Sequence, residues 1–336
     1  VRKFMRQFCE NYDMEGIEMD FCRHLNYFKS VAWGGTASKT ELRQMSDLVR
    51  DIRAITREFE LKRGHPILLT ARVPDSPEFC RDVGFDLDTW LKEKSVDALI
   101  CGCYFNLNDP QVMADYIHAR GAKCYASIDE SRIPGSAATT KAPLIPGRDT
   151  LENYRARFAA AMSAGCDGAY LFNLEGSRLN EYCRVDPREL DGCDKIYFAT
   201  ERGSGGYTPN SWLKDGKRFN NLPDIDPGAP RKMKPGETYS FEMFFGDDFG
   251  GSPKVTAEAL TGLTDGAATL TVNGTLCKRL AENGGCVSYE IAPGVLRKGM
   301  NAFAVTFPAS APKDATFNDF AVRVRACEVN DGKGTR

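Results

Sequence analysis

The first two hundred residues alternate short apolar runs with longer amphipathic segments five times, and this alternation constrains the fold more than any other feature. The apolar runs cover residues 16–21, 66–72, 96–102, 122–128 and 165–173. Between them apolar residues recur at helical spacing, most clearly over 40–61, where Thr40 is the expected N-cap and Gly64 the expected stop. Repeated strand-helix units predict a parallel sheet, in a (β/α)8 barrel or a doubly wound fold. No G-x-G-x-x-G follows a strand, so a dinucleotide site has no support.

The C-terminal part follows a different pattern. Residues 203–235 are rich in Gly, Pro and Asn and are expected to form a linker or a loop packed on the first domain. Beyond them hydrophobicity alternates with period two, and the dipeptide Asn273-Gly274 predicts a tight turn. Strands are expected at 238–245, 254–260, 268–272, 287–291, 302–307 and 320–324. The sequence therefore predicts an α/β domain over 1–202 and an antiparallel β-sandwich over 236–329.

Charge and targeting signals exclude some functions. The net charge of -2 favours neither nucleic acid nor an anionic membrane as a partner, and no apolar run reaches the roughly 20 residues of a membrane-spanning helix. The chain opens on Val1 with no signal-like stretch, so we expect an upstream part; the protein would be extracellular or periplasmic if that part carried a signal peptide. Oligomeric state is not indicated.

Twelve cysteines raise the question of metal binding and of disulfides. Cys101 and Cys103 have no second pair at zinc-ligand spacing, so we expect neither a zinc site nor any other cofactor. Cys277 and Cys286 flank a Gly-rich turn and are either free or joined across a hairpin, because geometry decides between the two.

Residues 12–24, with the sequence YDMEGIEMDFCRH, resemble the YDxDGIxxDxxR strand of bacterial family 10-like glycosyl hydrolases. Residues 68–74, 96–100 and 168–173 are similar to later strands of those proteins, so that the likeness spans 3–197. It implies a TIM-barrel glycosidase acting on a polysaccharide or complex glycan, of which this chain holds about strands 4–8. Residues 268–275 and 299–303 are similar to galactose-binding-like, jelly-roll-like sandwiches, which bind sugar or brace a barrel.

Carboxylates at strand ends are the candidates for catalysis, because barrel active sites lie at the C-terminal ends of the strands. Period two places Glu18 and Asp20 on one inward face. Glycoside hydrolysis needs two carboxyl groups, and the resemblance implies Glu130 as nucleophile and Asp20 as acid/base or substrate-binding residue. The Asn-Glu-Pro found at strand four of the better-known retaining families is absent at the first strand here, so Glu18 and Glu175 are alternatives for the acid. As purely structural roles, Glu18 would pair with Arg72, and Glu130 would cap a loop.

Other polar and aromatic residues near strand ends are candidates for substrate binding. They are Arg23, His24, Arg72, Tyr104, Asn173 and Trp33. The arginines suit sugar hydroxyls or an anionic substituent but form salt bridges as readily. The aromatics, with Phe105, either stack on sugar faces or pack against loops.

Three functions fit these residues. The first is a glycoside hydrolase, and the second is a non-catalytic glycan-binding protein on a degenerate barrel. The third is another barrel enzyme, such as a lyase or a metal-dependent hydrolase, with Asp20, His24 and Glu130 as ligands. This third function would make the activity depend on a divalent ion, and we expect no such dependence.

Overall fold

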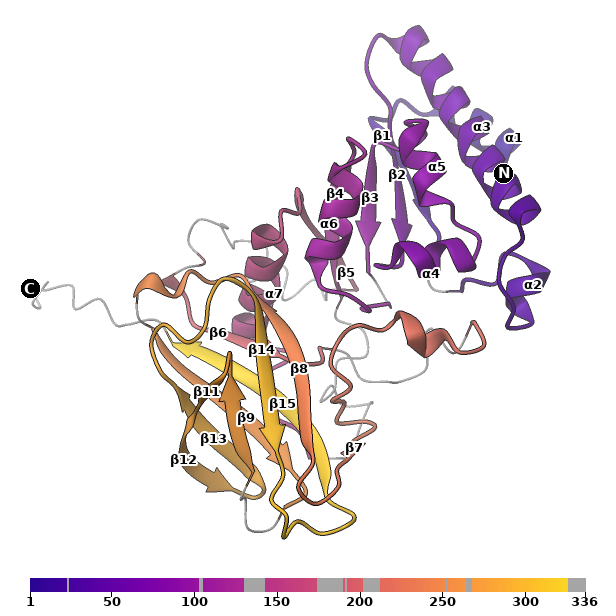
Figure 1. Cartoon of the computed structure of the whole chain (residues 1–336). Coiled ribbons are helices and arrows are strands. Elements are labelled where there is room, and N and C mark those ends of the chain that lie inside the picture. The colour runs from indigo at the N-terminus through magenta and orange to yellow at the C-terminus, as the bar shows by residue number, and fades with distance from the viewer. Residues whose placement is uncertain are drawn as a thin grey trace, which may run out of the picture. The chain divides into compact units, whose positions relative to one another are not determined.

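The computed structural model describes residues 1–22, 24–102, 105–129, 143–173, 190, 192–201, 212–251, 253–263 and 268–325 (Figure 1). The chain forms two compact units. The first comprises residues 1–131, 164–174 and 204–222, and the second comprises 132–163, 175–203 and 223–336. The expected domain ranges 1–202 and 236–329 stay a prediction, while the units group 132–163 and 175–203 with the C-terminal strands.

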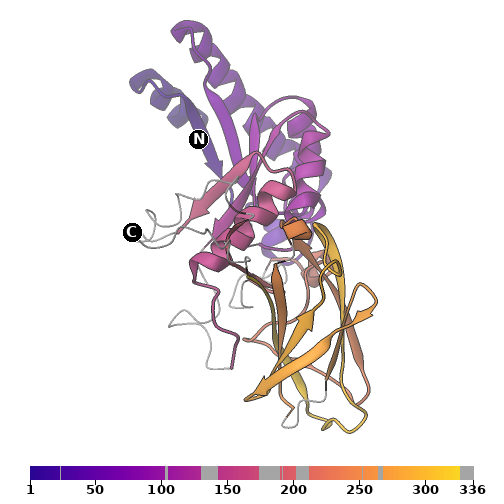
Figure 2. The same ribbon diagram turned by 90° about the vertical axis from the view of Figure 1, so that its left-hand side faces the viewer.

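The first unit is built on a parallel sheet of five strands, β1-β2-β3-β4-β5 in spatial order, as the sequence predicted (Figures 1 and 2). The strands are β1 (Gly16–Asp20), β2 (Leu68–Val73), β3 (Ala98–Cys101), β4 (Lys123–Asp129) and β5 (Gly168–Phe172). The parallel sheet and the separate antiparallel sheets described below confirm a mixed α/β fold. That the five strands are strands 4–8 of a barrel stays a prediction.

The first unit also contains helices. They are α1 (Arg2–Asn11), α2 (Lys29–Ala32), α3 (Lys39–Arg63), α4 (Pro77–Asp82), α5 (Leu87–Lys92) and α6 (Pro110–His118), with the 3-10 helix η3 (Gly216–Phe219). The N-cap of the long helix α3 is Ser38 rather than the expected Thr40, because Ser38 and Glu41 form a capping box. It ends at Gly64, as expected, where φ is 78°.

One face of the parallel sheet is apolar and buried. Its buried side chains include those of Met19, Leu69, Leu99 and Cys124. Helix α6 packs on β3 and β4. Because side chains alternate along a strand, the intervening residues, Glu18 and Asp20 among them, lie on the opposite face.

The second unit contains two antiparallel sheets. One has the order β11-β10-β14-β8 and the other β12-β13-β9-β15-β6, with β7 paired to β15. Its elements are α7 (Leu151–Ser163), β6 (Lys195–Phe198), β7 (Arg231–Lys232), β8 (Thr238–Phe245), η4 (Phe249–Gly251), β9 (Lys254–Thr261), β10 (Thr269–Val272), β11 (Thr275–Leu276), β12 (Lys278–Asn283), β13 (Cys286–Ile291), β14 (Gly299–Thr306) and β15 (Thr316–Arg325). All six expected strands are present; β6, β7, β11 and β12 were not expected.

Aromatic side chains fill the core of the second unit. The Phe241 ring lies 5.5 Å from that of Phe303 and 5.0 Å from that of Phe320, so residues of both sheets meet there. The predicted turn at Asn273-Gly274 joins β10 to β11, and the φ angles of 47° and 82° are those of the tight turn that this dipeptide favours.

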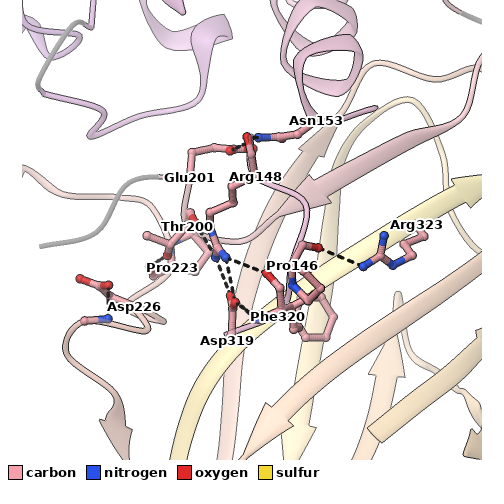
Figure 3. A network of polar contacts seen from close by, with 12 residues as sticks. Pro146, Arg148, Asn153, Thr200, Glu201, Pro223, Asp226, Asp319, Phe320 and Arg323 are labelled. Carbon is pink, nitrogen blue, oxygen red and sulfur yellow. Dashed lines mark hydrogen bonds and ion pairs between the residues drawn. The ribbon is translucent and has the colours of Figure 1, made fainter. Parts of the chain in front are cut away.

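A buried ion pair ties several segments of the second unit together (Figure 3). Arg148 and Asp319 have side chains 1% and 0% exposed and lie 2.6 Å apart. The guanidinium also donates to the carbonyl of Thr200 and lies 3.9 Å from the Phe198 ring centre. Asp319 accepts from the backbone N–H of Ile145 as well. The pair therefore connects β15 to the end of β6 and to the segment before α7.

The remaining expectations concern cysteines and membranes. Cys277 and Cys286 are both free thiols, so the disulfide is not formed. Over the described ranges, no three His, Cys, Asp or Glu side chains gather in a way that would hold a metal ion. Within the same residues, no helix is long and apolar enough to cross a membrane.

Candidate active site

We call the polar side of the parallel sheet the inner face. It carries Glu18 and Asp20 from β1, Arg72 from β2, and Tyr170 and Phe172 from β5. The register places Asp20 directly opposite Arg72 on the neighbouring strand. Asp20 and Phe172 are the last residues of their strands, Arg72 is the last but one, and Glu18 and Tyr170 are the middle residues of theirs. The group therefore extends to the carboxyl end of the sheet, where parallel α/β folds bind ligands.

The sheet is strongly curled, as a contact between side chains of its two edge strands shows. In a flat sheet β1 and β5 would be four strand spacings apart, roughly 19 Å. Yet the hydroxyl of Tyr170 on β5 donates to Oε1 of Glu18 on β1 at 3.1 Å. A hydrogen bond at that distance requires the two edges to bend toward each other over the inner face.

Asp20 is held by a bidentate pair with Arg72. Nε of Arg72 donates to Oδ1 at 2.9 Å and Nη2 donates to Oδ2 at 3.0 Å. The backbone N–H of Cys22 is a third donor, at 3.0 Å. The Arg72 side chain is 2% exposed, whereas that of Asp20 is 47% exposed. Asp20 is therefore the solvent-facing member of an ion pair whose cation is buried. The register aligns Arg72 with Asp20 rather than with Glu18, its partner in the structural alternative.

Aromatic rings of β5 complete the inner face. The Arg72 guanidinium carbon lies 3.9 Å from the centre of the Phe172 ring and 5.6 Å from that of Tyr170. Burial raises the pKa of the Tyr170 hydroxyl, the negative charge of Glu18 raises it further, and the positive charge of Arg72 lowers it. Tyr170 thus stays a protonated donor to Glu18 at neutral pH.

Three further predicted residues lie on loops or at strand ends. His24 follows β1, is exposed, and meets Trp212 edge-on with 5.8 Å between ring centres. Trp33 follows α2 and is 81% exposed, with the Lys29 ammonium 5.4 Å from its ring. Asn173 ends β5 in a left-handed conformation, with φ at 53°. Their roles in binding stay predictions.

Four predicted residues lie outside the described residues. These are Arg23, Tyr104, Glu130 and Glu175. Phe105 is described and is 1% exposed, packing against Phe79 with 5.5 Å between ring centres, so it offers no face to a sugar. The prediction that Arg72 contacts substrate stays untested, and its 2% exposure suits a role in orienting Asp20 better.

Sequence reasoning missed Tyr170 and Phe172. The sequence pattern could have identified them, because both flank the apolar Leu171 on a predicted strand and so lie on the face opposite to it. The residues predicted from this strand were instead Asn173 and Glu175, which follow it. The contact of Tyr170 with Glu18 had no sequence signal, because it depends on the curl of the sheet.

A buried carboxyl group of the first unit lies beside the ends of β2 and β3. Asp75 accepts hydrogen bonds from the backbone N–H groups of Leu107, at 2.9 and 3.0 Å, and of Asn108, at 3.2 Å. Burial raises its pKa to about 7, although these donors act in the opposite direction. Asp75 fastens the loop after β3 to the loop after β2.

Comparisons with known proteins give no family for this chain. No protein-family model and no curated protein matches it. Among solved structures, similarity is found to the chitinase ChiA74 from Bacillus thuringiensis, with 12% identity over 95% of this chain and 75% of that one, at a TM-score of 0.32. A family GH18 chitinase from Chromobacterium violaceum is 11% identical over 97% of this chain and 68% of that one, at a TM-score of 0.28.

A third similar structure is a β-porphyranase of glycoside hydrolase family 86 from Bacteroides plebeius, 10% identical over 84% of this chain and 74% of that one, at a TM-score of 0.23. All three are glycoside hydrolases that act on polysaccharides. TM-scores of this size establish neither a shared fold nor a shared activity, so any functional argument has to come from the side chains of the inner face.

Proposed function

We propose that the chain is a glycoside hydrolase that cleaves a polysaccharide or complex glycan with carboxyl groups of the inner face. The observation that carries this proposal is the placing of Glu18 and Asp20 on one face of a curled parallel sheet, each oriented by a different donor. Two oriented carboxyl groups are the minimum that glycoside hydrolysis requires.

The donors suggest different roles for the two residues. Asp20 accepts hydrogen bonds from a guanidinium and from a backbone N–H. An ionised carboxylate suits the stabilisation of positive charge on the sugar or the binding of its hydroxyls. Glu18 has a neutral donor, Tyr170, and suits proton transfer. Glu130 remains the proposed nucleophile and Glu175 the proposed reserve acid.

The resemblance of residues 12–24 to family 10-like glycosyl hydrolases supports a carbohydrate substrate. The antiparallel sheets of the second unit are proposed to be a galactose-binding-like domain that binds sugar or braces the first unit. An aromatic ring beside an ion pair, as Phe172 is beside Arg72 and Asp20, suits the mixed polar and apolar faces of a sugar.

The test is the release of reducing ends from a panel of chitin, agarose, porphyran and plant polysaccharides. The proposal expects release by the wild-type chain, loss of at least a hundredfold in Glu18→Gln, Asp20→Asn and Glu130→Gln, and unchanged release in Glu242→Gln. Glu242 is an exposed residue of β8 in the second unit and serves as the matched control.

One observation favours a second function, a glycan-binding protein without catalysis. Both carboxylate oxygens of Asp20 are already engaged by the Arg72 guanidinium. This arrangement suits a carboxylate that binds sugar hydroxyls better than one that transfers a proton. This alternative expects no release from any polysaccharide but retardation of the chain in gels that contain one of them. Release that a chelator abolishes and a divalent ion restores would instead point to a metal-dependent enzyme.

A further inference from the structure

Strand β5 reaches both carboxylates of the inner face through two side chains. The Tyr170 hydroxyl contacts Glu18, and the Phe172 ring lies under the guanidinium that holds Asp20. Tyr170 and Phe172 are two residues apart on β5, as Glu18 and Asp20 are on β1. One edge strand therefore contacts Glu18 directly and packs against the guanidinium that holds Asp20 on the other edge strand.

The two carboxyl groups have unlike donors. Asp20 accepts two hydrogen bonds from the charged guanidinium and one from a backbone N–H. Glu18 accepts from the phenol of Tyr170, which carries no charge. A cationic partner opposes protonation of a carboxylate far more strongly than a neutral donor does. The hydrogen-bond partner of Glu18 is therefore neutral, whereas that of Asp20 is charged.

We propose that Tyr170 is the positioning residue that orients Glu18 as the proton-exchanging group of the inner face. This inference rests on the proposed glycosidase function. Glu18 gives its proton to the leaving oxygen as the glycosidic bond breaks. It then takes a proton from the water whose oxygen bonds to the anomeric carbon, so one water is consumed and Glu18 ends protonated. Tyr170 keeps its own proton throughout and touches no substrate atom.

The first test measures the contact without any activity. The chain is labelled with 13Cζ-tyrosine, and the resonance that disappears in Tyr170→Phe identifies Tyr170. Because the charge of Glu18 raises the pKa of Tyr170, the Tyr170 resonance in Glu18→Gln titrates at lower pH than in the wild type. The control Glu15→Gln removes an equal charge just before β1 and leaves that titration unchanged. Titration at the same pH in wild type and Glu18→Gln would overturn the inference.

The second test measures hydrolysis of whichever polysaccharide the wild type cleaves. Tyr170→Phe lowers kcat roughly tenfold and leaves KM within twofold, because general acid–base catalysis depends on orientation. The basic limb of its pH–rate profile moves to higher pH, because Glu18 must be protonated to act as the acid and its carboxylate form loses a donor. The control Tyr116→Phe removes a hydroxyl from α6, where the ring packs on the Arg120 guanidinium, and keeps the wild-type kcat and profile.

The outcomes separate the two proposals. An active wild type with an equally active Tyr170→Phe and an unmoved profile would overturn the role of Tyr170 alone. An inactive wild type whose Tyr170 titration shifts in Glu18→Gln would overturn the glycosidase function while supporting the Tyr170–Glu18 contact. If Tyr170→Phe fails to fold, the Glu18→Gln titration is repeated with the Tyr170 resonance assigned from backbone spectra.

Discussion

Arg72 and Asp20 form a bidentate ion pair in which the cation is 2% exposed and the carboxylate is 47% exposed. The two residues lie directly opposite each other on neighbouring parallel strands. Because only the carboxylate meets water, the two ends of this pair are not equivalent, and removing either one has a different consequence.

Asp20→Asn is expected to destabilise the first unit more than Arg72→Met does. The first variant leaves a buried guanidinium without its counter-ion, and its free energy of unfolding falls by about 2 kcal/mol. This loss is smaller than for a fully buried pair, because water reaches position 20. The second leaves a carboxylate that water can solvate and keeps an apolar stem against Phe172. Urea unfolding followed by tryptophan fluorescence measures this, since Trp33, Trp90 and Trp212 all belong to the first unit. A larger loss in Arg72→Met would contradict the account.

The buried carboxyl of Asp75 makes the first unit sensitive to pH. Its pKa is raised by burial from 3.8 to about 7. The native state therefore binds this proton more tightly than the unfolded state does. The resulting stabilisation is present at acid pH and is lost as pH rises from 3.8 through about 7, by a few kcal/mol at most.

The measurement compares the tryptophan-detected urea midpoints of the wild type and Asp75→Asn at pH 5 and pH 8. Relative to the variant, the wild type is expected to be less stable at pH 8 than at pH 5. A difference that stays constant, or that changes in the other direction, would show that Asp75 does not titrate in this range.

The strands of the parallel sheet were predictable because each is a short apolar run between amphipathic helices. The pairing of Arg72 was not, because Glu18 and Asp20 share one face and only the register decides between them. Strand β6 was missed as a member of the second unit for a related reason. Its four residues, Lys195–Phe198, continue a strand-helix series in sequence, yet they pair antiparallel with β15, and nothing local in the sequence identifies that partner.

The Arg148–Asp319 pair is expected to behave as a coupled unit. Removing one member, in Arg148→Met or Asp319→Leu, leaves a charge buried in the second unit and destabilises it by about 3–5 kcal/mol. The double variant Arg148→Met/Asp319→Leu loses less than the sum of the single variants, because no charge is left unpaired. Unfolding of the second unit followed by near-ultraviolet circular dichroism of its tyrosines provides the double-mutant cycle. Additive losses would mean that the pair is not coupled.

Gly246 is expected to be irreplaceable in the second unit. A Cβ atom at this position would overlap the backbone of Ala159 in α7, so Gly246→Ala forces the helix away from the end of β8. Gly192→Ala is the matched control, because a Cβ there meets nothing within 4 Å. Thermal unfolding should show a lower midpoint for Gly246→Ala and no change for Gly192→Ala. Equal midpoints for the two variants would show that α7 can move away from β8 without loss of stability.

The most direct test of the central claim is the rate at which the wild-type chain, Glu18→Gln and Glu15→Gln release reducing ends from the same polysaccharide. Glu15 lies one residue before β1, so its substitution changes the charge near the same strand without touching the inner face. The account predicts release by the wild type and Glu15→Gln at equal rates, and at least a hundredfold less by Glu18→Gln. Equal release by all three proteins would contradict a catalytic role for the inner face.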